Sequence, residues 1–219
     1  MRMLYRDMAR RLTFILPARR VAIVGIDGPA GSGKTTFAVH LHEALRELGT
    51  SVESIPMEDF YLPQKAKPKE EQSAIDFIRY YDWRRLRDQV LIPISAGKEA
   101  SFRRFDWRGG QLGLWRDVKP NGVFLIDGLS STRPELKEFL TMRVWVDCPR
   151  DARLERGLAR AAEASTAGWE QVLPEEERYI RFHRPDEAAH LLLDGSGTFP
   201  HDLATEFVVI ARRDFAVWR

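Results

Sequence analysis

The stretch Gly28-Pro29-Ala30-Gly31-Ser32-Gly33-Lys34-Thr35 decides the fold class predicted for this chain. It fits the Walker A pattern G-x-x-x-x-G-K-[ST] at every fixed position. The apolar run at 21–26 predicts a buried strand before it, and the pattern over 37–48 predicts a helix after it. Glycines let the backbone wrap closely, so N–H groups and the positive end of the helix face phosphate oxygens. The sequence therefore predicts a strand, a phosphate-binding loop and a helix in that order.

The side chains of this loop define a nucleotide site. We expect Lys34 to reach the β- and γ-phosphates of a nucleoside triphosphate and the Thr35 hydroxyl to hold Mg²⁺. The residues expected to contact the nucleotide are Gly28, Gly31, Ser32, Gly33, Lys34, Thr35 and Thr36. The alternative is a glycine-rich turn that matches by chance, and the strand and helix patterns on its two sides argue against it.

The composition is that of a globular protein. Of the 219 residues 44% are hydrophobic and 30% are charged, which suits one α/β domain over 1–219 with insertions. The net charge of +2 does not indicate a nucleic-acid partner. No apolar run is long enough to span a membrane, so we expect no membrane segment. The single cysteine, Cys148, excludes an internal disulfide and suits a cytoplasmic protein.

Strand and helix patterns alternate along the rest of the chain. We expect helices at about 3–14, where the helix is basic and amphipathic, at 82–95 with Asp82 as its N-cap, and from 151 and 174 onward. Strands are predicted at 52–57, 123–126, 143–147, 191–193 and 207–210. This alternation predicts an α/β fold with one parallel sheet and helices on both faces. The Gly109-Gly110 pair lies between two strand patterns and predicts a β-hairpin insertion at about 100–117.

Acidic residues follow two of the predicted strands. Asp127 ends the most apolar strand, where a carboxylate would hold Mg²⁺, although a turn aspartate before Gly128 is the alternative. Glu58 and Asp59 end the strand at 52–57. If that strand neighbours the first, one of the two carboxylates would face the γ-phosphate and take a proton from an acceptor hydroxyl. Solvated loop acids are the other interpretation of this pair.

Three arginines mark the helix that begins near 151. Arg153, Arg156 and Arg160 are spaced three and four residues apart, so they share one helix face. An exposed basic helix is one interpretation. The other is a lid, spanning about 151–185, that closes on a triphosphate and stabilises negative charge in the transition state.

Four motifs together resemble a known family. They are GPAGSGKTT at 28–36, EDFY at 58–61, FLIDG at 124–128 and D-x-R-L-x-R-x-x-x-R from 151. Over residues 20–195 the chain resembles the uridine kinase and related nucleoside kinases of the P-loop kinase group. The resemblance implies a P-loop kinase fold with a five-stranded parallel sheet, a hairpin insertion, a helical lid, and ATP with Mg²⁺. It also implies transfer of the γ-phosphate to the 5′-hydroxyl of a nucleoside, and it leaves the oligomeric state open.

The resemblance also assigns roles to matching residues. It implies catalytic roles for Lys34, Arg160 and a base that is either Glu58 or Asp59, and phosphate contacts for Arg153 and Arg156. The substrate-binding residues that it implies are Tyr61, Asp76 and Phe105. The alternative for Asp76 is a surface acid, and the alternative for Phe105 is a ring in the core of the hairpin.

One departure from the family concerns the acceptor. Uridine kinases carry a histidine that reads the pyrimidine, and the matching position here is Gly110. A site that lacks the polar side chain recognising the base loses discrimination between substrates by orders of magnitude. A nucleoside remains the favoured acceptor, with pantothenate or a sugar phosphate as alternatives. A nucleotide-binding switch without transfer activity is the competing class of function.

Overall fold

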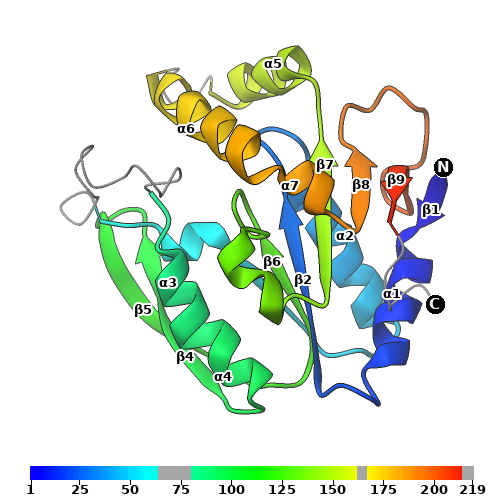
Figure 1. Cartoon of the computed structure of the whole chain (residues 1–219), viewed down its shortest axis with the longest axis vertical. Helices are drawn as coiled ribbons and strands as arrows, with labels where there is room; N and C mark the ends of the chain where they lie inside the picture. The colour runs from blue at the N-terminus through cyan, green and yellow to red at the C-terminus, as the bar shows by residue number, and fades with distance from the viewer. Residues whose placement is uncertain (64–79, 162–166, 214–219) are drawn as a thin grey trace.

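The computed structural model describes residues 1–63, 80–161 and 167–213, and within these ranges seven strands form one sheet (Figure 1). Their order is β1-β9-β8-β7-β2-β6-β3. The strands are β1 (Arg2–Leu4), β2 (Val21–Asp27), β3 (Val52–Pro56), β6 (Gly122–Asp127), β7 (Met142–Asp147), β8 (Leu191–Asp194) and β9 (Glu206–Arg212). The five strands from β3 to β8 in this order are parallel, as predicted. The sheet is larger than predicted, because β9 and β1 extend it with antiparallel pairing.

Helices cover both faces of the sheet (Figure 1). The α-helices and turns are α1 (Tyr5–Ile15), α2 (Lys34–Glu47), η1 (Met57–Phe60), α3 (Trp83–Leu86), η4 (Arg87–Leu91), α4 (Ile92–Ser95), η5 (Pro134–Phe139), α5 (Arg150–Ala161), α6 (Ala167–His183) and α7 (Pro185–Ala188). Helices α1 and α2 pack on one face, and the continuous α3-η4-α4 segment packs on the other. No described helix has both the length and the apolar character that crossing a membrane requires.

The central strand β6 shows how the sequence produces these layers. Phe124 and Ile126 belong to the apolar cluster under α3 and α4, whereas Val123 and Leu125 belong to the cluster under α1 and α2. Successive side chains of a strand point to opposite faces, so a continuous apolar run suits a strand covered on both sides. All four of these side chains are fully buried.

Two predicted element boundaries were wrong. The N-terminal helix, expected at 3–14, is α1 from Tyr5 to Ile15, and residues 2–4 form β1 against β9. Three residues are too few to show a period, and their strand partner lies at the other end of the chain. The helix expected from Pro174 begins at residue 167 and ends at His183. Arg184 then adopts a left-handed backbone (φ 44°) before the short α7.

The predicted hairpin forms a separate two-stranded sheet. Strand β4 (Ala100–Asp106) pairs antiparallel with β5 (Gln111–Val118), and Gly110 occupies the turn with φ 63°. Asp82 caps α3 by accepting a hydrogen bond from the Arg85 N–H, as expected.

The carboxyl ends of three parallel strands bring the predicted acids together. Asp127 is paired in register with Ile26 of β2 on one side and with Pro56 of β3 on the other. Strand β3 is therefore not the neighbour of β2, because β6 lies between them. This order places Asp127 between the phosphate-binding loop, which follows β2, and Glu58, which follows β3. Ligands of open α/β sheets bind at this edge.

Candidate active site

The phosphate-binding loop (residues 28–35) depends on glycine at particular positions. Gly33 has φ 99° and directly precedes α2, so any other residue there would be strained. Gly28 has φ 149°, and a Cβ at this position would lie 2.4 Å from the Val146 carbonyl oxygen. The loop therefore needs glycine at Gly33 for its backbone conformation and at Gly28 for close approach to β7. It leaves the first turn of α2 open to a bound anion.

Lys34, Thr35 and Asp127 form the part of the site that fits a metal-bound triphosphate. The Lys34 ammonium donates to the Pro29 carbonyl oxygen at 2.8 Å, which keeps it over the loop. The Thr35 hydroxyl lies close enough to the Asp127 carboxylate to lower its pKa. Asp127 Oδ1 is buried and has no hydrogen-bond partner, so an oxygen that suits Mg²⁺ is available beside the Thr35 hydroxyl. No group of three or more acidic, histidine or cysteine side chains suited to a metal occurs in the described ranges. The site therefore fits a Mg²⁺ ion that has few protein ligands and whose remaining ligands are phosphate oxygens and water.

Several charged groups lie near Asp127. The pKa of its carboxyl is raised to about 6, mainly by burial, while Lys34 opposes the rise. Glu58 and Asp27 contribute to the rise, because each brings a negative charge close to the carboxyl. A bound divalent cation would stabilise the ionised carboxylate that this environment disfavours.

Glu58 and Asp59 are adjacent in sequence but lie in different surroundings. Glu58 is exposed, accepts a hydrogen bond from the Tyr81 hydroxyl at 3.2 Å, and is close enough to Asp127 to raise its pKa. Asp59 is only 4% exposed and accepts a hydrogen bond from Arg104 Nε at 2.9 Å. Arg116 lies 3.8 Å from its other oxygen. Glu58 is therefore free to meet an acceptor, whereas Asp59 is bound to the β4–β5 hairpin.

Aromatic side chains gather beside Glu58. The Tyr61 ring lies 5.2 Å from the Phe105 ring and 4.8 Å from the Trp107 ring, measured between centroids. Tyr80 and Tyr81 complete the group, with centroids 5.7 and 5.9 Å from Tyr61. The structure thus brings the predicted Tyr61 and Phe105 together and adds three rings that the sequence reasoning missed. The signals for them were the Tyr80-Tyr81 pair before the Asp82 cap and a tryptophan at the hairpin turn. We call these five rings the aromatic cluster.

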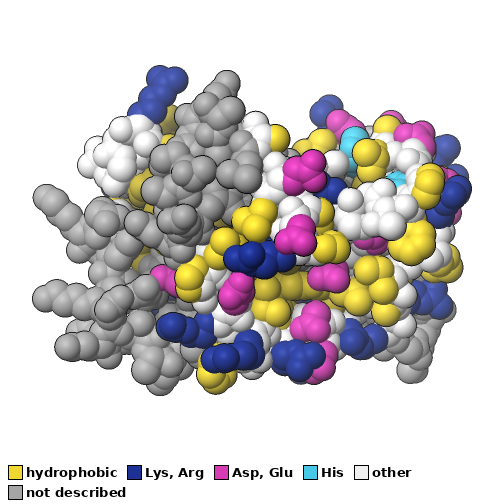
Figure 2. Space-filling view, turned by 90° about the horizontal axis from the view of Figure 1, so that it is seen from above, with side chains coloured by type: hydrophobic (Ala, Val, Ile, Leu, Met, Phe, Trp, Pro, Cys, Tyr) yellow, Lys and Arg dark blue, Asp and Glu magenta, His cyan; other side chains and the backbone are white. Residues whose placement is uncertain are grey.

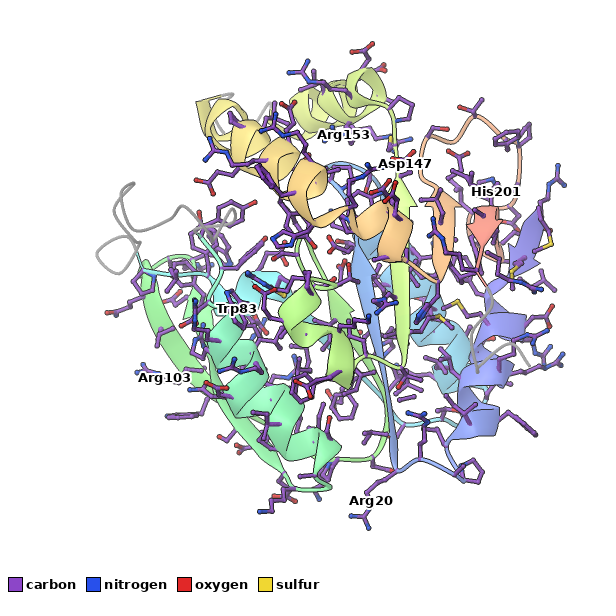
Figure 3. All side chains as sticks on the ribbon, in the orientation of Figure 1. Arg20, Trp83, Arg103, Asp147, Arg153 and His201 are labelled. Atoms are coloured by element: carbon purple, nitrogen blue, oxygen red, sulfur yellow. The ribbon has the colours of Figure 1, made fainter. Side chains whose placement is uncertain are left out.

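The arginines of α5 reach the phosphate-binding loop from above the sheet, where Figure 3 labels Arg153. Arg153 Nη1 is 2.6 Å from Glu176 Oε1 on α6 and 3.3 Å from the Ala30 carbonyl oxygen. Arg156 donates to the carbonyl oxygens of Gly195 and Ser196 at 2.6 and 2.7 Å. Its contact with the Gly31 carbonyl oxygen is longer, at 3.4 Å.

The side chains of two predicted site residues lie outside the described part of the structure. Asp76 lies outside the described residues, and so does the Arg160 side chain, although α5 includes the Arg160 backbone. Their roles stay predictions.

Asp27 is a buried residue of the site that the sequence reasoning missed. It is fully buried, and its two oxygens accept five hydrogen bonds at 2.7 to 3.1 Å. The donors are the Gly28, Ser130 and Thr132 N–H groups, the Thr132 hydroxyl and the Tyr179 hydroxyl. Burial raises the pKa of Asp27, and these donors oppose that shift because they stabilise the ionised form. Asp27 therefore ties the phosphate-binding loop to the segment after β6 and to α6.

The second link between α6 and the loop is Glu176. This carboxylate is fully buried and accepts a hydrogen bond from the Ala30 N–H at 2.7 Å while it pairs with Arg153. Glu176 and Tyr179 are three residues apart, so one face of α6 makes both contacts. These two contacts hold α6 against the phosphate-binding loop (Figure 1).

Replacing Asp27 tests how strongly the loop depends on this buried carboxylate. We expect Asp27→Ala to destabilise the protein by about 2–4 kcal/mol, because it leaves five donors without an acceptor in a buried site. Tyr179→Phe removes one donor only and should cost about 1–2 kcal/mol. Urea denaturation followed by circular dichroism measures both values. Equal stability of Asp27→Ala and the wild type would contradict the role assigned to this network.

A cavity of about 260 Å³ borders the loop on the side away from Glu58. It is lined by Gly31 to Gly33, by Arg156 and by the segment between β8 and β9, which includes His201 (Figure 3). Gly195 approaches so closely that a Cβ there would lie 1.9 Å from the Ser32 carbonyl oxygen.

Comparison with models of protein families shows which family the chain belongs to. The model of the phosphoribulokinase/uridine kinase family matches residues 23–187. The chain belongs to the phosphoribulokinase/uridine kinase family. Membership in this family identifies the chain as a P-loop kinase, and ATP is the phosphate donor that the family implies, typically with Mg²⁺.

Individual relatives of this kinase are distant. It is 27% identical over 173 residues to a uridine kinase of Deinococcus deserti, covering 76% of this chain and 79% of that protein. A uridine kinase of Staphylococcus aureus is 24% identical over 170 residues, covering 76% and 80% of the two chains. This level of identity supports the kinase family and leaves the acceptor open.

Solved structures share the fold. A possible uridine kinase from Bacillus stearothermophilus superposes with a TM-score of 0.60 at 23% identity, covering 85% of this chain and 98% of that one. A D-glycerate 3-kinase from Cryptococcus neoformans var. grubii gives a TM-score of 0.57 at 15% identity, covering 87% and 94%. The fold of this kinase therefore accommodates acceptors of different chemistry.

Proposed function

We propose that this kinase transfers the γ-phosphate of ATP to a hydroxyl group of a small molecule, and that the acceptor is a nucleoside phosphorylated on its 5′-hydroxyl. The observation that carries the proposal is the convergence of Lys34, the Thr35–Asp127 pair and Glu58 at the carboxyl ends of β2, β6 and β3. These groups supply a phosphate clamp, metal-binding oxygens and a base at one edge of the sheet.

The proposed reaction assigns a step to each group. The acceptor oxygen forms a bond to the γ-phosphorus, the bond from that phosphorus to the β–γ bridging oxygen breaks, and ADP leaves. Glu58 takes the proton of the acceptor hydroxyl, and Lys34 stabilises negative charge on the transferring group. Thr35 and Asp127 would hold Mg²⁺, which neutralises charge on the β- and γ-phosphates when it is bound.

The aromatic cluster supports a flat acceptor. Phe105 and Trp107 lie with ring centroids 5.0 Å apart, and Trp107 is 61% exposed, so an open aromatic surface lies beside Glu58. Stacking on such rings is insensitive to the identity of the base. Gly110 supplies no polar side chain at the hairpin turn, so we propose a broad nucleoside preference. The absence of a polar side chain at Gly110 also favours a non-nucleoside acceptor, such as pantothenate or a sugar phosphate, as the second candidate.

Acceptor identity is tested with a panel of compounds. The protein is incubated with ATP and Mg²⁺ and with nucleosides, pantothenate, sugar phosphates or glycerate, and ADP formation is followed by a coupled assay. We expect ADP formation that depends on a nucleoside. Turnover of non-nucleosides alone would replace the nucleoside proposal with the second candidate. Nucleotide binding without turnover of any acceptor would favour a switch.

Truncating the aromatic cluster tests whether it binds the acceptor. We expect Trp107→Ala to raise KM for the nucleoside about 5- to 100-fold, because stacking contributes about 1–3 kcal/mol per base. KM for ATP should not change. Leu114→Ala is the matched control, since Leu114 lies on the same hairpin, is 85% exposed and is not one of the five rings of the cluster. An unchanged nucleoside KM in Trp107→Ala would remove the cluster from the acceptor site.

A further inference from the structure

A second, larger cavity lies under α7, away from the phosphate-binding loop. Its volume is about 470 Å³, and it is enclosed by η5, the first residues of β7, the end of α6 and α7. The charged and titratable side chains that line it are Lys137, Arg143, His183, Glu187, His190 and Arg213. Three of these six side chains, Lys137, Arg143 and Arg213, are cations and one, Glu187, is an anion, so the cavity carries a positive charge close to the +2 of the whole chain.

Lys137, Arg143 and Arg213 form no ion pair with a carboxylate of the described residues. Arg143 donates to the Ala188 carbonyl oxygen at 3.0 Å and lies 3.0 Å from His190 Nε2. Arg213 donates to the carbonyl oxygens of Asp186 and Ala189 at 2.9 and 2.8 Å. Glu187, the lining carboxylate, pairs with Arg184 at 2.5 Å. Carbonyl oxygens orient these two guanidinium groups, and no carboxylate of the described residues is paired with either of them.

The pKa of His190 is sensitive to the positive charges of the cavity. Its Nδ1 accepts the Arg143 backbone N–H at 3.2 Å. Burial and then Arg143, Arg213 and Lys137 lower the pKa of the imidazole to about 4. Lys137, Arg143 and Arg213 line the same cavity, so a dianion bound in it would be attracted by all three.

We propose that this cavity binds a phosphomonoester dianion, held by Lys137, Arg143 and Arg213. Guanidinium groups already oriented by hydrogen bonds suit the oxygens of a phosphate, and an ammonium group adds a point charge without fixed direction. The volume leaves room for an organic group attached to the phosphate. No motif of the sequence assigned a role to this region.

The cavity is connected to the phosphate-binding loop by two short routes. Thr132 lines the cavity and donates both its N–H and its hydroxyl to Asp27 Oδ2, at 3.1 and 2.8 Å. His183 lines the cavity, and its ring centroid lies 5.2 Å from that of Tyr179, which donates to the same oxygen of Asp27. A ligand in the cavity would therefore lie beside Thr132, which is bonded to Asp27, and beside His183, which packs on Tyr179. Its binding should change KM for ATP as well as occupying the cavity.

Binding is measured with the nucleotide site already filled, so that phosphate cannot bind the loop. The protein is saturated with a non-hydrolysable ATP analogue and Mg²⁺, and glycerol phosphate, inorganic phosphate or citrate is titrated by calorimetry at constant ionic strength. We expect glycerol phosphate to bind and to raise the NMR-detected pKa of His190, because an adjacent dianion stabilises the imidazolium. Lys137→Gln should weaken this binding about tenfold, through loss of one charge-assisted contact.

Controls separate this site from general charge effects. Lys137 and Lys98 are both exposed, and Lys98 lies outside the cavity, so Lys98→Gln should leave the affinity for glycerol phosphate unchanged. Absence of glycerol phosphate binding to the nucleotide-saturated wild type, or equal affinity in wild type and Lys137→Gln, would overturn the proposal. Tighter binding of citrate than of glycerol phosphate would overturn the ligand class. None of these measurements requires turnover, so they are independent of the proposed acceptor.

Discussion

Lys34→Ala should lower kcat about 100- to 1,000-fold, the loss typical of removing one group that stabilises charge in a transition state. In the structure Lys34 makes its side-chain hydrogen bond to the Pro29 carbonyl oxygen within its own loop. It is also close enough to oppose the rise in the pKa of Asp127. Its contribution is therefore electrostatic and local to the phosphates, so the variant should fold normally.

The control for this variant is Lys98→Ala, which removes an exposed ammonium from the turn after α4. We expect Lys98→Ala to keep the kcat of the wild type. Thermal unfolding of both variants shows whether the fold is retained. The Lys34→Ala protein could also be folded and still turn over ATP and acceptor at the wild-type rate. That result would contradict the placement of the phosphates beside Lys34.

Glu58→Gln should lower kcat about 100- to 10,000-fold, because it removes the group that takes the acceptor proton and keeps its size. Glu58 is exposed at the carboxyl end of β3 and holds one hydrogen bond, from the Tyr81 hydroxyl. An amide at this position still meets the tyrosine but has no basic oxygen. Stability should change by less than about 0.5 kcal/mol, as for most surface substitutions.

Asp59→Asn is the matched control for the base assignment. It changes the adjacent carboxylate, which is bound to Arg104 and lies near Arg116 of the hairpin. We expect a loss of stability of about 1–2 kcal/mol, from weaker charge-assisted hydrogen bonding, and a decrease in kcat of less than about tenfold. Steady-state kinetics and urea denaturation of both variants distinguish the roles. A large kcat loss in Asp59→Asn with near-normal Glu58→Gln would reverse the assignment.

The local parts of the site were predictable from the sequence because they are determined by short-range patterns. The loop at 28–35, the apolar β6 strand and the position of Asp127 at its end all follow from spacing and periodicity. The choice between Glu58 and Asp59 did not follow, since adjacent residues share the same spacing. The turn of η1 gives them different directions, and the hairpin arginines then bind only one of them.

Contacts between distant segments were beyond the sequence patterns. Asp27 meets Tyr179 across 152 positions, and Ala30 meets Glu176 across 146. The order of strands also depends on long-range packing, so the sequence left open whether β3 neighbours β2, and the structure places β6 between them. The net charge of +2 did not indicate the basic cavity. Figure 2 shows Lys and Arg side chains interspersed with Asp and Glu on the face viewed from above.

Transfer of label from γ-labelled ATP to an isolated acceptor is the measurement that decides whether this site performs phosphoryl transfer. The wild type and Lys34→Ala are incubated with labelled ATP, Mg²⁺ and each compound of the acceptor panel, and the products are separated by chromatography. The proposed chemistry predicts labelled nucleoside 5′-monophosphate with the wild type and a loss of about 100-fold or more with Lys34→Ala. Label that stays in ATP or appears only as inorganic phosphate, whichever acceptor is present, would contradict it.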